Sequence, residues 1–362
     1  MNLAHIRSKA PTRIDLAGGT VDIWPIYLFL NRAITLNVGI DLFAETELDE
    51  TTDGQVHLVS GDQKIELKLA WDELQSARPH PAVELHLKLL RHFAPLAQKR
   101  LSASGGKLPG LRLSTRAKSP AGAGLGGSST LSVSMIGALA SWAEGNPIDP
   151  QSIGERLVEI VRDIETTVIH VPAGLQDYYG AMFGGLQCLH WGTGTHSRER
   201  FDARTLQDLE DRLLLFYSGQ SRNSGINNWA LYKGFIDKQN DVRERFEKIN
   251  EATWKAERAL RARDWQAVGQ AIAEEWSVRR TLAPGITTPE IDQAFATAAR
   301  LVPGSAGKIC GAGGGGCFFV YTPEALPAAE KARVAEAIAA TGVRHLPFRA
   351  VPHGVEVDYR GA

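Results

Sequence analysis

A glycine-rich segment near the middle of the sequence has the composition of a phosphate-binding loop. It reads Pro-Ala-Gly-Ala-Gly-Leu-Gly-Gly-Ser-Ser-Thr over residues 120–130, between a run typical of a strand and an apolar run typical of a helix. Glycines let backbone N–H groups approach an anion closely, and the start of a helix adds partial positive charge. The hydroxyls of Ser128 and Ser129 can cap the helix or reach a metal ion or phosphate. A tight turn with a serine cap is the alternative interpretation.

The common loops of related composition do not fit this segment. Its letters match Gly-x-Gly-x-x-Gly, but a dinucleotide-binding fold also needs an acidic residue about 20 positions later, at the end of a second strand. Residues 141–150 in that region read as a turn. No lysine follows the glycines as a Walker A loop requires, and the Gly-x-Ser-x-Gly of a serine nucleophile is absent. An NAD-binding oxidoreductase is therefore disfavoured.

Two further motifs stand on either side of the loop. Residues 11–22 read Pro-Thr-Arg-Ile-Asp-Leu-Ala-Gly-Gly-Thr-Val-Asp, and residues 308–317 read Lys-Ile-Cys-Gly-Ala-Gly-Gly-Gly-Gly-Cys. Four successive glycines cost much backbone entropy if they serve nothing. The second motif is interpreted as a loop that closes on the substrate or on the nucleotide phosphates, with a flexible hinge as the alternative.

Together and in this order, the three motifs resemble those of the GHMP kinase family, which includes galactokinase, homoserine kinase and mevalonate kinase. The resemblance extends over most of the chain. It implies an α+β fold with two domains, expected over residues 1–200 and 201–362. The first would resemble domain 2 of ribosomal protein S5, with a left-handed βαβ crossover, and bind ATP. The second would be ferredoxin-like, and the final strand could return to either half.

The resemblance also implies roles for individual side chains. Asp177 matches the catalytic aspartate, which orients or deprotonates the acceptor hydroxyl. Arg13 would lie near it, lower its pKa and stabilise charge on the transferring group. Glu165 and Ser128 match Mg²⁺ ligands, and Ser129 replaces Ser128 if the register of the loop differs by one. Taken alone, Asp177 also fits a turn-capping residue, Arg13 a residue on the surface of a strand, and Glu165 a solvated residue of a helix.

The remaining implied contacts belong to ATP and to the acceptor. The residues expected to bind ATP are Pro120, Gly122, Ala123, Gly124, Leu125, Gly126, Gly127, Ser128, Ser129, Gly313 and Gly314. The residues expected to bind the acceptor are Gly18, Gly19, Thr20, Asp22 and Arg222.

Asp22 lies where sugar kinases of the family hold substrate hydroxyls. Galactokinases carry Glu-His in place of Gly19-Thr20, which puts galactose in doubt. The pattern is most similar to the D-glycero-D-manno-heptose 7-phosphate kinase branch, although Val21 replaces its usual threonine. Arg222, in a polar turn, is a candidate for binding an acceptor phosphate. The predicted reaction is ATP- and Mg²⁺-dependent phosphorylation of a sugar or sugar phosphate, with the anomeric hydroxyl favoured.

Two other functions stay open at this point. A kinase of a mevalonate-type or amino-alcohol acceptor would carry the same three motifs. A catalytically silent family member could bind a ligand and regulate, although it would not need to keep Arg13, Ser128, Glu165 and Asp177 together.

The elements that must position these residues can be read from hydrophobic periodicity. Strands are expected at residues 5–18, 33–48, 55–60, 64–69 and 110–120, with later strands ahead of and behind the second glycine motif. Helices are expected at about 82–97, 128–142 and 152–168, and charged helices dominate residues 227–283.

Composition limits the remaining classes of protein. The 362 residues are 43% hydrophobic and 22% charged, and 40 basic against 41 acidic residues give a net charge of −1. No strong field favours nucleic acid or an anionic membrane. No apolar run reaches the length of a membrane span, and three cysteines are too few for a disulfide framework. Ten histidines without paired spacing make zinc disfavoured. We expect a cytoplasmic monomer or homodimer with a small-molecule partner.

Overall fold

The computed structural model describes residues 3–361 except 79, 104, 121, 221–223 and 240. The strands are β1 (His5–Ala17), β2 (Ile34–Thr51), β3 (Gln55–Ser60), β4 (Ile65–Ala70), β5 (Gly110–Ala117), β6 (Leu186–His190), β7 (Ser197–Arg200), β8 (Leu213–Tyr217), β9 (Ala306–Ile309), β10 (Cys317–Tyr321), β11 (Arg344–His345) and β12 (Glu356–Arg360). The α-helices are α1 (Glu84–Ala103), α2 (Gly127–Glu144), α3 (Pro150–Ile169), α4 (Gln176–Phe183), α5 (Ala203–Glu210), α6 (Ser224–Ile236), α7 (Val242–Ala262), α8 (Trp265–Arg279), α9 (Pro289–Leu301) and α10 (Ala328–Ala339). Three short 3₁₀ turns are η1 (Ile26–Phe29), η2 (Trp71–Glu73) and η3 (Pro81–Val83).

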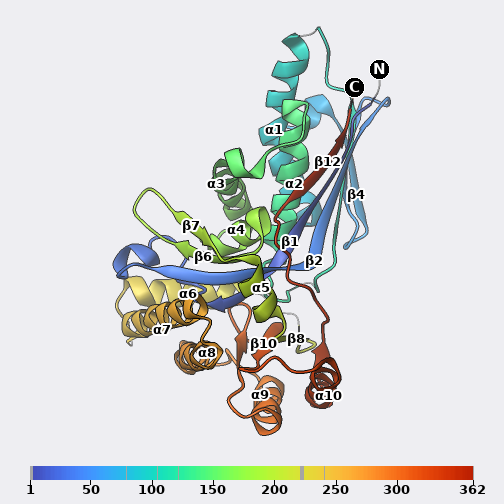
Figure 1. Cartoon of the computed structure of the whole chain (residues 1–362). Coiled ribbons are helices and arrows are strands. Elements are labelled where there is room, and N and C mark those ends of the chain that lie inside the picture. Colours follow the sequence, from blue (N-terminus) through green and yellow to red (C-terminus); the bar gives the residue numbers. More distant parts are fainter. Residues whose placement is uncertain are drawn as a thin grey trace.

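A large mixed sheet forms the upper part of the molecule in Figure 1. Its strand order is β12-β1-β2-β5-β3-β4, and β6 pairs with β2 and carries β7. The neighbours β3 and β5 run parallel, and α1 lies in the connection between them. The long strands β1 and β2 pair antiparallel with register shifts at Pro11/Thr12 and Asp15/Ala17. These irregularities lie within the N-terminal motif and change how its side chains are directed.

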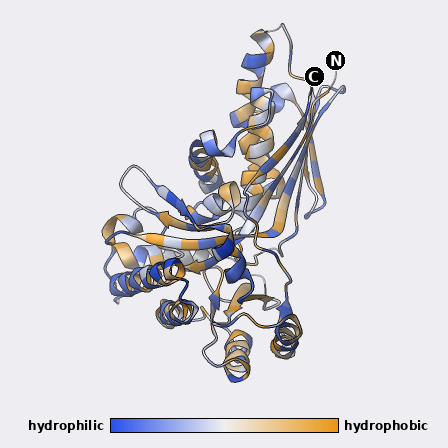
Figure 2. Ribbon diagram, viewed as in Figure 1, coloured by the Kyte–Doolittle hydropathy of each residue, from blue (hydrophilic) through white to orange (hydrophobic). Residues whose placement is uncertain are grey.

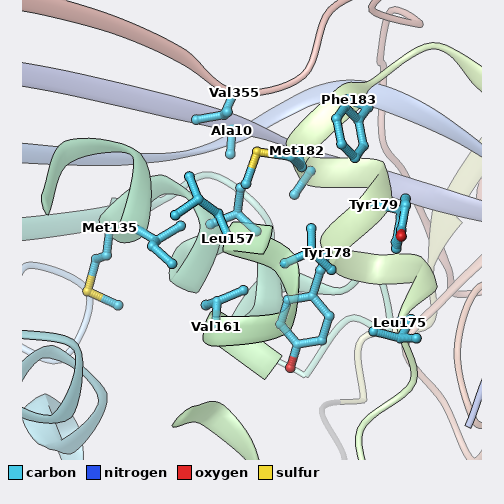
Figure 3. Packing of buried hydrophobic residues seen from close by; sticks show 14 of the residues in the cluster. Ala10, Met135, Leu157, Val161, Leu175, Tyr178, Tyr179, Met182, Phe183 and Val355 are labelled. Atoms are coloured by element: carbon cyan, nitrogen blue, oxygen red, sulfur yellow. The ribbon is translucent and has the colours of Figure 1, made fainter. Parts of the chain in front are cut away.

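Helices α1, α2 and α3 cover one side of the large sheet (Figure 1). Helix α2 is apolar along most of its length and nearly all its residues are buried, whereas α7 carries a long hydrophilic face (Figure 2). Helix α4 packs into the same core, with Tyr178 and Met182 among side chains of α3 such as Leu157 and Val161 (Figure 3). A helix that is apolar around most of its surface fits a position between a sheet and other helices.

A smaller antiparallel sheet has the order β11-β8-β10-β9. Its strands follow one another along the chain as β8, helices, β9, β10, α10 and β11, which is the connectivity of a ferredoxin-like fold. The expected α+β architecture with two domains is therefore confirmed. The final strand β12 returns to the large sheet and pairs with β1. The domain limits at residues 200 and 201 stay a prediction.

Local signals explain where several helices begin. Asp149 accepts a hydrogen bond from the N–H of Gln151, and Pro150 occupies the first helical position of α3. Thr288 caps α9 in the same way ahead of Pro289. Helix α4 was not expected, and neither were α5 and β7.

The structure also bears on the cysteines and on membrane-spanning helices. Cys188, Cys310 and Cys317 are all buried and none forms a disulfide. In the part of the chain that the structure describes, no helix combines the length and apolarity needed to cross a bilayer.

Candidate active site

A cavity of about 770 Å³ brings the three sequence motifs together. The N-terminal motif contributes Arg13, Asp15, Thr20 and Asp22 to its lining. The other motif residues that line it are Pro120, Gly122, Ala123, Gly124, Gly126, Gly127, Ser128, Ser129, Cys310, Gly311 and Ala312. The predicted residues Glu165 and Asp177 also line the cavity, and so does Gln176, which was not predicted. Residues nearly 300 positions apart in the chain therefore share one site.

Arg13 on β1 connects the walls of this cavity. Its Nε and Nη2 atoms lie 2.7 and 2.5 Å from Oδ1 of Asp177. Its Nη1 donates to the backbone carbonyls of Gly124 and Cys310, each at 2.9 Å. Burial acts to lower the pKa of Arg13, but the carboxylates of Asp177 and Asp15 overcome it and raise that pKa. The guanidinium is thus a permanent cation that fixes the aspartate, the first glycine loop and the second in one arrangement.

Asp177 lies in the first turn of α4, and this helix is fastened to the large sheet beneath it. The side chain of Asn37 on β2 donates from Nδ2 to the carbonyl of Gln176 at 3.0 Å. One turn later, Gly180 lets α4 approach β1 closely because it has no side chain. A Cβ added at Gly180 would lie 2.9 Å from Cβ of Arg13. About a quarter of the Asp177 side chain stays exposed, so the carboxylate can meet a ligand in the cavity.

The N-terminus of α2 faces the same cavity without a side-chain cap. Gly126 precedes the helix in the left-handed region, at φ 72°, and no side chain accepts a hydrogen bond there. The first backbone N–H groups of α2 are therefore available to an anion. An added Cβ at Gly126 would lie 2.9 Å from Cγ of Asp177, so a glycine here lets the loop approach the carboxylate closely.

Glu165 on α3 is buried beside two hydroxyls of α2. Ser128 donates to Oε1 at 2.6 Å and Ser132 donates to Oε2 at 2.9 Å. Burial raises the pKa of Glu165 despite these hydrogen bonds. Within the described residues no cluster of three or more His, Cys, Asp or Glu side chains could hold a metal ion. A hydroxyl and one carboxylate nevertheless fit Mg²⁺, which binds few protein oxygens and takes further ligands from phosphates and water.

Asp22 is a second buried carboxylate in the cavity. Its Oδ2 accepts the N–H of Gln176 at 2.8 Å. Burial raises the pKa of Asp22 to about 7, and the backbone hydrogen bond opposes this shift. Asp22 is therefore suited to bind hydroxyl groups either as an acceptor or, when protonated, as a donor.

A buried network of four charges below the N-terminal motif was missed by sequence reasoning. Lys308 Nζ lies 2.9 Å from Oδ2 of Asp15 and 3.5 Å from Oε1 of Glu275, and Arg279 Nη2 lies 2.6 Å from the same glutamate oxygen. All four side chains are at most 3% exposed. Asp15 and Lys308 stand inside the quoted motifs, but Glu275 and Arg279 lie on α8, in a region whose sequence indicated only charged helices.

Several predicted residues lie outside the cavity lining. Leu125 is fully buried, and Gly18 and Gly19 do not line the cavity although Thr20 does. Gly313 and Gly314 pack against Ile286, where the N–H of Gly314 donates to the carbonyl of Ile286 at 2.7 Å. Gly311 and Ala312 line the cavity in their place. Arg222 lies outside the described residues.

The end of β3 and the turn that leads to β4 add lining residues that were not anticipated, namely Ser60, Asp62 and Gln63. Asp62 Oδ2 accepts the N–H of Ala117 at 2.9 Å, so this turn is tied to the strand that leads into the first glycine loop. The hairpin was visible in the sequence, but its place beside the loop depends on the parallel pairing of β3 and β5.

Two family models match the chain. Residues 87–185 match the model described as GHMP kinases N terminal domain, and residues 256–342 match the model described as GHMP kinases C terminal. The first covers α1 to α4 with the first glycine loop, and the second ends after the second glycine loop and α10.

Individual relatives agree with these models. The chain is 26% identical over 328 residues to the D-glycero-alpha-D-manno-heptose 7-phosphate kinase of Campylobacter jejuni, covering 87% of this chain and 89% of that protein. It is 25% identical to the bifunctional fucokinase/GDP-fucose pyrophosphorylase of Arabidopsis thaliana over 89% of this chain and 30% of that longer protein. The crystal structure of a D-glycero-D-manno-heptose 1-phosphate kinase from Bacteroides thetaiotaomicron has the same fold, with a TM-score of 0.72, 21% identity and coverage of 97% and 98% of the two chains.

Proposed function

Since this chain belongs to the GHMP kinase family, we propose that it transfers the terminal phosphoryl group of ATP to a hydroxyl of a sugar or sugar phosphate, with the anomeric hydroxyl favoured. One observation carries this proposal. The carboxylate of Asp177 is held by Arg13 at the same cavity that the uncapped N-terminus of α2 faces. A phosphate site and an oriented carboxylate in one cavity are what phosphoryl transfer to an alcohol requires.

The residues of the phosphate side bind and neutralise charge. Backbone N–H groups at the start of α2 and in the glycine loop would hold the phosphates of ATP. Arg13 supplies a fixed positive charge near the group in transfer, and its three acceptors keep it from moving during the reaction.

Ser128 and Glu165 would hold Mg²⁺, which when bound neutralises charge on the phosphate oxygens. The short hydrogen bond from Ser128 to Glu165 brings the two oxygens together ahead of any metal. Ser132 holds the other carboxylate oxygen and so fixes the orientation of Glu165.

Asp177 would orient the acceptor hydroxyl and accept its proton as the bond to phosphorus forms. The contact with Arg13 holds this carboxylate in place at the cavity. Thr20 and Asp22 would bind further hydroxyls of the acceptor, because both line the cavity next to this pair.

A heptose 7-phosphate is the first acceptor to test. The Campylobacter relative is named a heptose 7-phosphate kinase, and this chain matches it over most of its length. The experiment is ADP release from Mg·ATP with heptose 7-phosphate, mannose, fucose, galactose, glucuronate, mevalonate, phosphomevalonate and homoserine. Turnover of one sugar, with product analysis at the anomeric carbon, supports the proposal. Turnover of mevalonate alone, or binding of ATP with no turnover of any acceptor, contradicts it.

A further inference from the structure

The turn that presents Thr20 to the cavity is strained. Thr20 has φ 69°, in the left-handed region, which a β-branched residue rarely adopts. Thr20 and Asp22 line the cavity, two residues apart. A conformation of this kind persists only where surrounding contacts impose it.

Thr35 on β2 donates to the carbonyl of Gly18 at 2.9 Å, and two further contacts come from α8, in the other half of the chain. Arg279 Nη2 donates to the carbonyl of Gly19 at 2.7 Å, and Nη1 donates to Oγ1 of Thr20 at 3.3 Å. Arg279 is 3% exposed and does not line the cavity, so it reaches the acceptor only through this turn.

The guanidinium is itself held rigidly. Its Nε donates to Oε1 of Glu275 at 2.7 Å, and Lys308 and Asp15 complete the buried charge network around that carboxylate. An added Cβ at Gly19 would overlap the carboxylate of Asp15, so the turn lies directly on the network. Few alternative positions are open to the turn while the network is intact.

We infer that Arg279 is a positioning residue for acceptor recognition, which holds residues 18–20 in the left-handed turn that directs Thr20 and Asp22 into the cavity. This inference rests on the proposed function, because it assigns the acceptor to that end of the cavity. It gives α8 a part in substrate selectivity without any contact between α8 and the substrate.

The test compares Arg279→Lys with Arg280→Lys. Lysine preserves the charge of the network but cannot donate to Glu275, Gly19 and Thr20 in one fork. Arg280 is the neighbouring residue, partly exposed and paired with Asp292, and serves as the matched control. We expect Arg279→Lys to raise KM for the acceptor about tenfold or more, while KM for ATP changes less than about twofold. Unchanged acceptor KM, or an equal rise for ATP, would overturn the inference.

A second measurement does not depend on turnover. Amide hydrogen exchange over residues 18–22 should be about tenfold faster in Arg279→Lys than in Arg280→Lys, with residues 122–129 unchanged. Equal protection in the two variants would refute the inference, even in a protein that phosphorylates none of the acceptors. If the wild type turned over no acceptor, the proposed function would fail. Faster exchange in Arg279→Lys than in Arg280→Lys would still support Arg279 as the residue that holds the turn.

Discussion

Asp177→Asn separates the chemistry of the carboxylate from its structural role. The amide has nearly the same shape and keeps an oxygen that can accept from Arg13, but it carries no charge and takes no proton. We expect kcat to fall by about 10²- to 10⁴-fold, the range for loss of a positioned general base. That corresponds to about 3–5 kcal/mol in the activation free energy.

The loss in the free energy of unfolding should be smaller than this rise in the activation free energy. Arg13 keeps two carbonyl acceptors at 2.9 Å, from Gly124 and Cys310, when the charge of Asp177 is removed. The aspartate is a quarter exposed, so the lost attraction is partly screened by solvent. We expect a decrease of about 1–3 kcal/mol in the free energy of unfolding.

The assay is single-turnover ADP formation together with ATP binding and urea unfolding. Asp163→Asn is the matched control, because this aspartate on α3 is 69% exposed and pairs with its neighbour Arg162. The control should match the wild type in all three measurements. Turnover of Asp177→Asn within about tenfold of the wild type would refute the assignment of Asp177 as the base.

Three further predictions follow from the same geometry. The folded pKa of Asp22, about 7, is above its unfolded value of 3.8, so its contribution to stability is full below pH 4 and is lost as the pH rises to 7. Between pH 5 and 8 the wild type should therefore lose on the order of 2–3 kcal/mol relative to Asp22→Asn in urea unfolding, and parallel pH profiles would contradict this. Gly126→Ala and Gly285→Ala both place a side chain at positive φ, at a cost of about 1–2 kcal/mol in stability. Of the two, Gly126→Ala alone brings the new side chain against the carboxylate of Asp177, so it should abolish turnover. Ser132→Ala removes a hydrogen bond to the buried Glu165 and should raise the Mg²⁺ concentration for half-maximal rate about tenfold, whereas Ser134→Ala on the same helix should not. Equal Mg²⁺ dependence of the two variants would contradict the proposed role of Glu165.

Sequence reasoning pointed to part of the cavity lining because that part is made of short contiguous motifs. A glycine loop before a helix has a local composition that can be recognised wherever it occurs, and residues 11–22 and 308–317 carry comparable signatures. Arg13 was expected to lie near Asp177, whereas its hydrogen bonds to the carbonyls of Gly124 and Cys310 were not foreseen.

What the sequence left open depends on tertiary pairing. Glu275 and Arg279 are separated by one helical turn and could equally form a solvated surface pair. Only the position of α8 against β1 and β9 buries them beside Asp15 and Lys308. Helix α4 has eight residues, with a glycine and three aromatic residues, so its intrinsic helical preference is weak.

The second glycine motif shows the same limit. Gly313 to Gly316 all have positive φ, and an added Cβ at Gly316 would lie 2.8 Å from the carbonyl oxygen of Ala123. The two glycine loops are therefore packed backbone to backbone, and composition alone cannot distinguish such packing from phosphate binding.

The pairing of β12 with β1 also affects how the protein folds while it is being synthesised. Residues 356–360 cover one edge of β1 at residues 5–9, and they leave the ribosome about 340 positions after that strand. At usual translation speeds the nascent chain keeps this edge uncovered for roughly 20–70 s. An uncovered strand edge pairs readily with other chains. The large sheet consequently reaches its full width only after residues 356–360 have left the ribosome.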